Sequence, residues 1–190
     1  MNEESSKIVF VGCVEAGFFC ARRLVQTGIR PSSIVSIDDS KAGKHRVIGH
    51  RDLFDLDVSC ERYMPDAYAL NSDQDISFFR ARSFDILVVL GWQRIIPKEI
   101  IDTLNICGLT IHGSVKGLPE GCGRSPMNWA IIEGSGEFHL SLLNLAPEAD
   151  GGRIVGTRKF DILQSDNIRT LYYKNALAAS YLFAEHLPVL

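Results

Sequence analysis

The feature that most constrains this 190-residue chain is the run at residues 85–91 (DILVVLG), which is apolar almost throughout. A strand whose two alternating faces are both apolar is typical of a parallel sheet that helices cover on both sides. Residues 7–12 (KIVFVG) form a similar run, and an apolar stripe at helical spacing follows over residues 14–27. Residues 33–37 (SIVSI) then complete a strand, helix, strand unit, which favours parallel pairing through a right-handed crossover.

The rest of the chain continues to alternate between helical and extended patterns. We expect strands at residues 109–112, 138–145 and 153–162, helices over residues 73–82 and 166–186, and shorter helices starting at Pro97 and at Ser125-Pro126. Asp73 and Ser125 are the expected helix caps, whereas residues 40–71 are too irregular to assign. Because no repeat or linker divides the sequence, it predicts one domain over residues 1–190. Its expected fold class is α/β and Rossmann-like, with a mostly parallel sheet flanked by helices.

Composition narrows the class of protein. Hydrophobic residues make up 46% of the chain and charged residues 23%, values of an ordinary globular protein that argue against disorder. The 20 Lys and Arg against 23 Asp and Glu leave a net charge of −3 without a basic run, so we expect no nucleic-acid partner. No apolar stretch approaches the roughly 20 residues that a membrane-spanning helix needs, so we expect no membrane partner either.

The start of the chain and its cysteines indicate the compartment. The first six residues (MNEESS) are polar and acidic, unlike a secretory signal. The five cysteines, Cys13, Cys20, Cys60, Cys107 and Cys122, are scattered and form no CxxC pair. We therefore expect neither a disulfide framework nor a zinc knuckle, and a cytoplasmic location.

The segment Thr110-Ile111-His112 is the first candidate for chemistry. Alternate side chains of a strand share a face, so Thr110 and His112 should point the same way, about 6.6 Å apart. Both are expected near the carboxyl end of a central strand, where open α/β sheets bind their ligands. A glycine-rich loop follows at residues 113–124. A histidine there can exchange a proton near neutral pH. Without its neighbours, however, His112 would be equally well explained as a structural histidine held by hydrogen bonds.

Asp150 is the second candidate. It opens the turn Asp150-Gly151-Gly152, and an aspartate in a glycine turn usually serves only the turn. If the strands at 109–112 and 138–145 are neighbours, however, Asp150 comes within reach of His112. The two would then form an acid/base unit of a transferase or a hydrolase.

Other motifs favour plain structural interpretations. Residues 12–17 (GCVEAG) lack the G-x-G-x-x-G spacing of a dinucleotide site, so they predict a simple turn from strand to helix. His45 and His50 are five residues apart in a basic stretch, which we interpret as solvated surface, and no metal site is expected. Trp129 falls inside the helix that starts at Pro126, where a core position is the expectation.

Four segments together resemble a known family. Residues 87–96 (LVVLGWQRII), 109–119 (LTIHGSVKGLP), 123–129 (GRSPMNW) and 150–154 (DGGRI) occur in this order in the formyltransferases that use N10-formyltetrahydrofolate. The family includes methionyl-tRNA, glycinamide ribonucleotide and nucleotide-sugar formyltransferases. The order of elements is similar over residues 7–182, but only residues 85–162 carry specific motifs.

The resemblance implies a role for each matching residue. His112 and Asp150 match the catalytic histidine and aspartate. Thr110 stands where the family has an asparagine that donates a hydrogen bond to the formyl oxygen. Thr110 is therefore the expected third catalytic residue, and it is the one position at which this sequence departs from the family pattern. The remaining matches are expected to bind the folate: Gly91, Trp92, Arg94 and Ile95 on one wall of the pterin slot, Ala146 and Glu148 in the loop that forms the other wall, and Ser114 and Leu118 beside the formyl group.

The acceptor is predicted by elimination among the relatives. Methionyl-tRNA formyltransferases resemble this core but add a C-terminal barrel, whereas this sequence ends after one helix. Glycinamide ribonucleotide enzymes have a phosphate loop after the first strand, where this chain has Glu15, which would repel a phosphate. A primary amine on a small molecule, a nucleotide-linked amino sugar, is therefore the expected acceptor.

Other functions stay open at this level. One is a formyltetrahydrofolate hydrolase, in which water replaces the amine. Another is a methionyl-tRNA formyltransferase-like core, and a third is a non-catalytic folate or nucleotide binder, which the change at Thr110 makes a fair alternative. The oligomeric state is open too, with a homodimer as one option.

Overall fold

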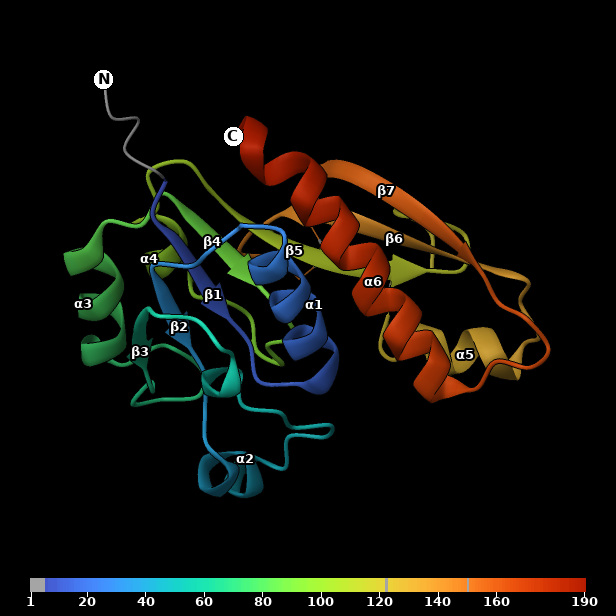
Figure 1. Ribbon diagram of the computed structural model, residues 1–190, viewed down its shortest axis with the longest axis horizontal. Helices are drawn as coiled ribbons and strands as arrows, with labels where there is room; N and C mark the ends of the chain where they lie inside the picture. Colours follow the sequence, from blue (N-terminus) through green and yellow to red (C-terminus); the bar gives the residue numbers. More distant parts are fainter. Residues whose placement is uncertain (1–5, 122, 150) are drawn as a thin grey trace.

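A seven-stranded sheet forms the centre of the computed structural model, which describes residues 6–121, 123–149 and 151–190. The strand order is β3-β2-β1-β4-β5-β6-β7 (Figure 1). The strands are β1 (Ile8–Val11), β2 (Ser33–Val35), β3 (Glu61–Tyr63), β4 (Ile86–Val89), β5 (Cys107–Ser114), β6 (Glu137–Asn144) and β7 (Ile154–Asp161). The helices are α1 (Glu15–Gln26), α2 (Asp39–His45), α3 (Asp73–Arg82), α4 (Lys98–Ile101), α5 (Pro126–Ile132) and α6 (Ile168–His186), with short 3₁₀ turns at Leu53–Asp55 and Leu187–Val189.

The sheet changes character at β5. The strands from β3 to β5 pair in parallel, whereas β6 and β7 are antiparallel to their neighbours. The pairing between β4 and β5 ends at Val88 and Leu109, but β5 continues to Ser114 with only β6 beside it. The second half of β5 therefore projects past the carboxyl end of β4. This is the edge where an open α/β sheet binds its ligands.

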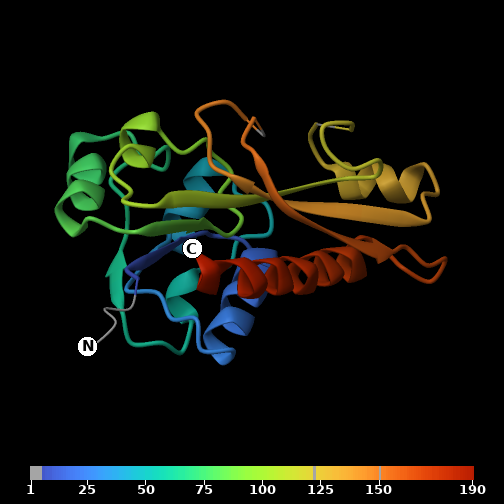
Figure 2. The same ribbon diagram turned by 90° about the horizontal axis from the view of Figure 1, so that it is seen from above.

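Helices cover the sheet on both faces, as the apolar runs predict. Figure 2 shows α1 and α6 on one side of the sheet and α3 and α4 on the other. Neighbouring residues of β1 illustrate the two layers: Phe10 packs in the cluster of α1 and α6, and Val9 packs in the cluster of α3. All four residues of β4 are buried. The mostly parallel, helix-flanked sheet predicted from the sequence is confirmed.

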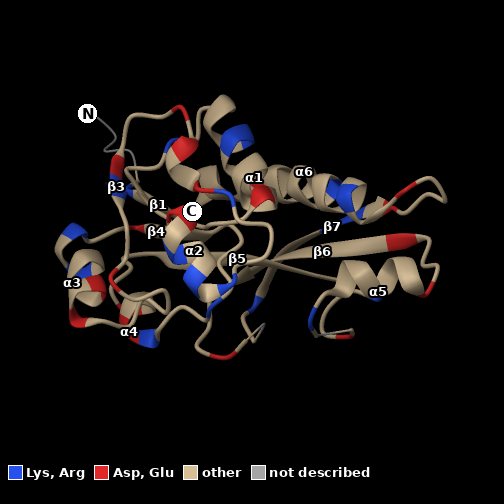
Figure 3. Ribbon diagram, turned by 90° about the horizontal axis from the view of Figure 1, so that it is seen from below, with Lys and Arg blue, Asp and Glu red and all other residues tan. Residues whose placement is uncertain are grey.

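Charged residues are absent from β1, β2, β4 and β5 but occur on β3, β6 and β7. Figure 3 shows Lys and Arg interspersed with Asp and Glu over the helices and the connecting loops. No helix in the described residues is both long enough and apolar enough to span a bilayer. The same part of the chain holds no group of three or more His, Cys, Asp or Glu side chains placed to bind a metal ion.

Two expected helix caps differ from the structure. α3 is capped by Ser72 rather than Asp73, and the carboxylate of Asp75 accepts a hydrogen bond from the backbone N–H of Ser72, which completes a capping box. Ser125 does precede α5, but its φ of 58° is left-handed and its side chain makes no capping hydrogen bond. Pro97 is the cap residue before α4 rather than the first helical residue.

Two expectations about single side chains are also wrong. His50 is not solvated, because its ring bonds the Ile37 carbonyl at 2.8 Å and the Asp39 carboxylate at 3.0 Å, and only 12% of its side chain is exposed. Trp129 is not a core residue, since 55% of it is exposed. α5 is short and buries Ala130, which turns the preceding position toward solvent.

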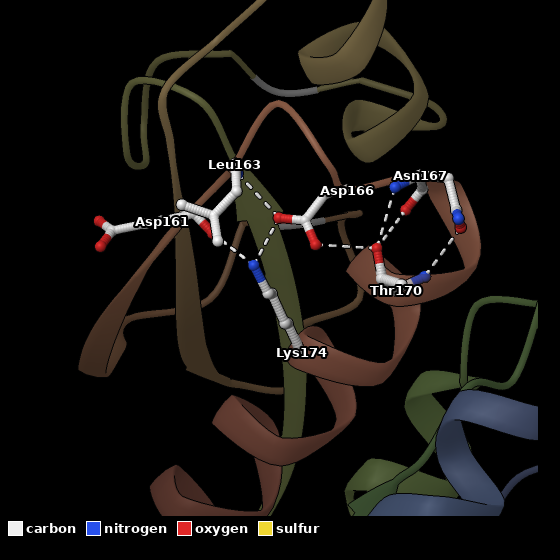
Figure 4. A network of polar contacts seen from close by, with 6 residues as sticks. All are labelled: Asp161, Leu163, Asp166, Asn167, Thr170 and Lys174. Carbon is white, nitrogen blue, oxygen red and sulfur yellow. Dashed lines mark hydrogen bonds and ion pairs between the residues drawn. The ribbon is translucent and has the colours of Figure 1, made fainter.

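A polar network fixes the beginning of α6 (Figure 4). Asn167 caps the helix by accepting hydrogen bonds from the backbone N–H groups of Arg169 and Thr170. The carboxylate of Asp166 accepts from the ammonium of Lys174 at 2.5 Å and from the hydroxyl of Thr170 at 2.9 Å. The Lys174 contact, followed by the backbone N–H of Leu163, lowers the pKa of Asp166 from 3.8 to about 2.

This shift predicts how the network responds to pH. A carboxyl whose pKa falls on folding stabilises the folded state above its unfolded pKa, and that contribution is lost as the pH falls through the folded value. We expect Asp166→Asn to lower the urea midpoint of unfolding at neutral pH, by an amount that shrinks from about pH 5 toward about pH 2. Asp161→Asn is the control, because Asp161 contributes only its backbone carbonyl to Lys174 and its carboxylate points away from the network (Figure 4). An Asp166→Asn effect independent of pH would contradict an ionic role.

Candidate active site

A cleft of about 410 Å³ opens where β5 projects past β4. Its walls come from the segment after β4, from β5 and β6, and from the loop after β6. The predicted site residues that line it are Trp92, Arg94, Ile95, Thr110, His112, Ala146 and Glu148. The sequence segments that carry the family resemblance therefore meet around one cleft, which we call the donor cleft.

The structure places other predicted site residues elsewhere. Ser114 is fully buried at the end of β5, where its hydroxyl donates to the Glu120 carbonyl at 2.8 Å. Neither Ser114 nor Leu118 lines the donor cleft, because the part of β5 that borders the cleft ends at His112 and both residues come later in the chain. Asp150 lies outside the described residues.

Thr110 and His112 come to the cleft on one strand. They pair across to Leu143 and Ser141 of β6, so the strands at 109–112 and 138–145 are neighbours, the condition on which an Asp150–His112 unit depends. Being two residues apart on a strand, the two side chains project from the same face. No residue of β4 pairs with either of them. Both side chains are half-buried, which leaves them in reach of a bound molecule.

A second cavity, of about 230 Å³, reaches Thr110 from the side of α1 and α6. Gly91, Tyr172 and Asn175 are among its lining residues, and none of the described residues that line it is charged. It shares Val89, Trp92, Thr110 and Ile111 with the donor cleft. Thr110 therefore lies where the two hollows meet. No local pattern in the sequence indicates this second cavity, because its walls come from segments far apart in the chain.

The turn from β1 to α1 borders the second cavity and explains the glycines at residues 12–17. A Cβ on Gly17 would lie 1.9 Å from the carbonyl oxygen of Leu90, and one on Gly12 would lie 2.2 Å from the same atom. These glycines allow the turn to pack directly against the end of β4. Their role is close backbone packing, in line with the simple strand-to-helix turn predicted for this segment.

Tyr68 supports the wall of the donor cleft. The guanidinium of Arg94 lies 4.7 Å from the centre of the Tyr68 ring, and Trp92 stands edge-on to that ring at 4.8 Å. On its other side the Tyr68 hydroxyl is 3.6 Å from the Cys13 sulfur. Burial raises the pKa of the Cys13 thiol to about 11, so this cysteine is protonated at neutral pH and is no nucleophile. Tyr68 falls in the irregular segment at 40–71, where the sequence offers no signal for it.

The charged groups of the donor cleft are few. Arg94, Arg124 and Glu148 line it, and Arg94 donates to the Gln93 carbonyl at 2.8 Å. Among its described lining residues the cleft therefore offers two cations and one carboxylate around an interior of mostly apolar side chains. Such a site suits a flat, largely apolar molecule that carries an anionic end.

One family profile covers most of the chain: the family described as formyl transferase matches residues 23–187. The chain belongs to this formyl transferase family. The resemblance drawn from the motifs is thereby confirmed. Curated relatives and structural neighbours of the chain are enzymes, which confirms the prediction of an enzyme family.

Individual members differ in the reaction that their names state. The methionyl-tRNA formyltransferase of Bacillus subtilis is 24% identical over 185 residues, which cover 96% of this chain and 57% of that protein. The chain thus spans little more than half the length of this curated relative. Three solved structures share the fold at 15% identity. The first is glycinamide ribonucleotide transformylase 1 of Symbiobacterium toebii, with a TM-score of 0.71 over 97% of this chain and 86% of that one. The second is a formyltetrahydrofolate deformylase of Pseudomonas syringae pv. tomato, with a TM-score of 0.71 over 97% of this chain and 61% of that one. The third is a sugar N-formyltransferase of a Shewanella species, with a TM-score of 0.63 over 96% of this chain and 68% of that one.

Proposed function

We propose that this chain forms the catalytic core of a formyltransferase that moves a formyl group from N10-formyltetrahydrofolate to a primary amine. The observation that carries the proposal is the meeting of two cavities at Thr110, beside His112. A two-substrate transfer needs such an arrangement, because donor and acceptor must reach the same atoms from different sides. A hydrolase needs only water at the second position, so the second cavity favours the transferase over the hydrolase.

The donor cleft fits the folate by its size and its charges. About 410 Å³ lies within the usual range for small-molecule sites. Trp92 and Ile95 on one wall and Ala146 on the other would hold the flat pterin. Arg94 and Arg124 would pair with the carboxylates of the donor's glutamate tail. When bound, the donor supplies an activated formyl group.

Three residues would perform the chemistry. As the amine attacks, negative charge develops on the formyl oxygen, and a positioned donor for that charge is typically worth about 3 kcal/mol. Thr110 is proposed as this donor, in place of the asparagine of the family pattern. His112 would take the proton that the amine loses and return it to the leaving nitrogen. Asp150 is proposed as the partner of His112 from the family resemblance.

The second cavity supports a small, neutral ring as the part of the acceptor that carries the amine. The part of its lining that the structure describes has no charged side chain, whereas Thr110, Tyr172 and Asn175 carry polar groups that can form hydrogen bonds. A sugar ring meets this requirement, so a nucleotide-linked amino sugar is the proposed acceptor. No nucleic-acid or membrane partner is proposed.

We also infer that the protein works in the cytoplasm. The described cysteines Cys13, Cys20, Cys60 and Cys107 are all free thiols. Burial raises the pKa of Cys13, Cys60 and Cys107 as well as that of Cys20. Unpaired thiols of this kind are typical of a reducing compartment.

The test of the function is turnover, measured as loss of formyl-folate with and without a panel of amino sugars. Thr110→Val removes the hydroxyl but keeps the shape, so we expect the rate of transfer to fall about 10-fold or more. Thr110→Asn restores the donor of the family pattern and should keep transfer at or above the wild-type rate. Loss of formyl-folate at a rate that added amine does not change would indicate the hydrolase. Folate binding without turnover in wild type and in Thr110→Asn would indicate the non-catalytic binder.

A further inference from the structure

A third hollow, of about 470 Å³, lies between the start of α1 and the first turns of α6. We call it the α1–α6 groove; Ala16 and Phe19 line it from α1, and Arg169, Tyr172 and Tyr173 line it from α6. The two helices run side by side on one face of the sheet (Figures 1 and 2). Ala16 and Tyr172 also line the second cavity, so the groove continues the path that begins at Thr110.

The groove presents aromatic rings to solvent. Tyr172 is 41% exposed and Tyr173 is 52% exposed, although they are neighbours on one helix. Phe19 meets Tyr173 edge-to-face, with the ring centres 6.0 Å apart and the planes at 83°. Grouped exposed rings beside a reaction centre are unfavourable in water and mark a binding surface. Rings with a polar tip are suited to stacking on a flat ligand.

Polar groups border these rings. Lys174 is already bound by Asp166 and by the Asp161 carbonyl (Figure 4), so its charge is compensated. Among the described residues of the groove, Arg169 is then the cation that no ion pair occupies, and Glu15 is a free carboxylate opposite it. A donor and an acceptor beside exposed aromatic rings match the edge of a nucleobase, which carries both kinds of group.

We propose that the α1–α6 groove binds the nucleobase of the acceptor against the exposed rings of Tyr172 and Tyr173, while the amine of the same molecule lies at Thr110. This assignment rests on the proposed function and names the far end of its acceptor. The occupant is a planar base rather than a phosphate, because Asp166 compensates Lys174 and Glu15 offsets Arg169, which leaves the described residues of the groove without net positive charge. It is not an apolar chain, because such a chain would leave Arg169 and Glu15 unused.

The direct test measures binding without turnover. The probes are uridine, thymidine and adenosine 5′-monophosphates, with ribose 5-phosphate as the probe that lacks a base, titrated calorimetrically into the whole chain. We expect at least one nucleotide to bind and ribose 5-phosphate to bind at least about 10-fold more weakly, since stacking on aromatic side chains accounts for such a factor. Equal binding of ribose 5-phosphate would overturn the proposal, and so would the absence of binding by all three nucleotides.

Matched tyrosine variants locate the site. Tyr172→Ala and Tyr173→Ala should each weaken nucleotide binding on the order of 10-fold, whereas the phenylalanine variants should keep it. Tyr181→Ala is the control: Tyr181 is 47% exposed on the same helix, but it packs under Arg158 of β7 and lies outside the groove. A loss of equal size in Tyr181→Ala would show that the effect is not local.

Kinetics separates this inference from the function on which it rests. With a nucleotide-linked amino sugar, Tyr173→Ala, which changes the groove but no residue that lines the second cavity, should raise the KM for the acceptor far more than it changes kcat or the KM for formyl-folate. If transfer occurs equally well to the free amino sugar, the groove assignment fails and the transferase stands. If no amine is formylated but nucleotides still bind in a way that depends on Tyr172, the transferase fails and the groove stands.

Discussion

Replacing His112 by alanine is expected to abolish formyl transfer, with a loss of at least about 100-fold, the lower end for a group that moves protons in catalysis. The reason lies in its position on β5, beyond the last pair with β4 and on the wall of the donor cleft. Because the side chain is only half-buried and faces a cleft, its removal takes little packing from the core. We therefore expect a folded protein whose thermal midpoint stays close to that of the wild type.

His139→Ala provides the matched control for this variant. His139 lies on the adjacent strand β6, where its ring bonds the Glu137 carboxylate at 3.0 Å. It lines neither the donor cleft nor the second cavity. The rate of formyl transfer and the thermal midpoint should be measured for both variants. A folded His112→Ala protein with a near-normal rate would remove His112 from the mechanism, and an equal loss in His139→Ala would point to a general effect on the sheet.

The sequence predicts the central elements of this fold well because their patterns are strong and local. The runs around β1 and β4 are apolar on both faces, and α1 and α6 carry long apolar stripes, so their positions agree with the structure within a few residues. β3 has three residues, of which none is buried, and such a strand leaves no pattern to detect. α2 depends on its cap at Asp38, which the sequence alone does not separate from an ordinary aspartate in a loop.

Part of the candidate site could likewise be predicted from the sequence, and part could not. Residues of the donor cleft lie in segments whose order and motifs could be matched to a family, so most of them were within reach of sequence reasoning. The second cavity and the α1–α6 groove are built by pairing the start of α1 with α6, elements separated by most of the chain. Tyr172 and Asn175 become site residues only through that pairing, and Tyr68 does so only through its packing against Trp92 and Arg94. Periodicity in the sequence describes each helix alone and contains nothing about which helices become neighbours.

The loop after β6 packs so tightly at Gly152 that one added methyl group there would displace it. A Cβ on Gly152 would lie 1.7 Å from the carbonyl oxygen of Asn144, and both atoms belong to backbone that cannot swing aside. The backbone N–H of Asn144 bonds the Arg153 carbonyl at 3.0 Å, which closes the base of this loop. Gly152 itself lines the donor cleft together with Ala146 and Glu148. Any side chain at position 152 must therefore push the wall of the cleft out of place.

Gly152→Ala is accordingly expected to lower the free energy of unfolding by about 3 kcal/mol, in the range for a steric clash in tightly packed backbone. Because the displaced wall would contact the folate, the KM for formyl-folate should also rise about 10-fold or more, as a misplacement of about 1 Å can cost such factors. Gly151→Ala is the neighbouring control: its Cβ would come no closer than 3.1 Å to the Glu148 Cβ and 3.6 Å to the Glu148 carbonyl oxygen, and its φ is not left-handed. We expect Gly151→Ala to stay within about 1 kcal/mol of the wild type in urea unfolding and to keep its KM. If the two alanine variants behaved alike in both measurements, the contact between Gly152 and Asn144 would not be what holds this wall of the cleft.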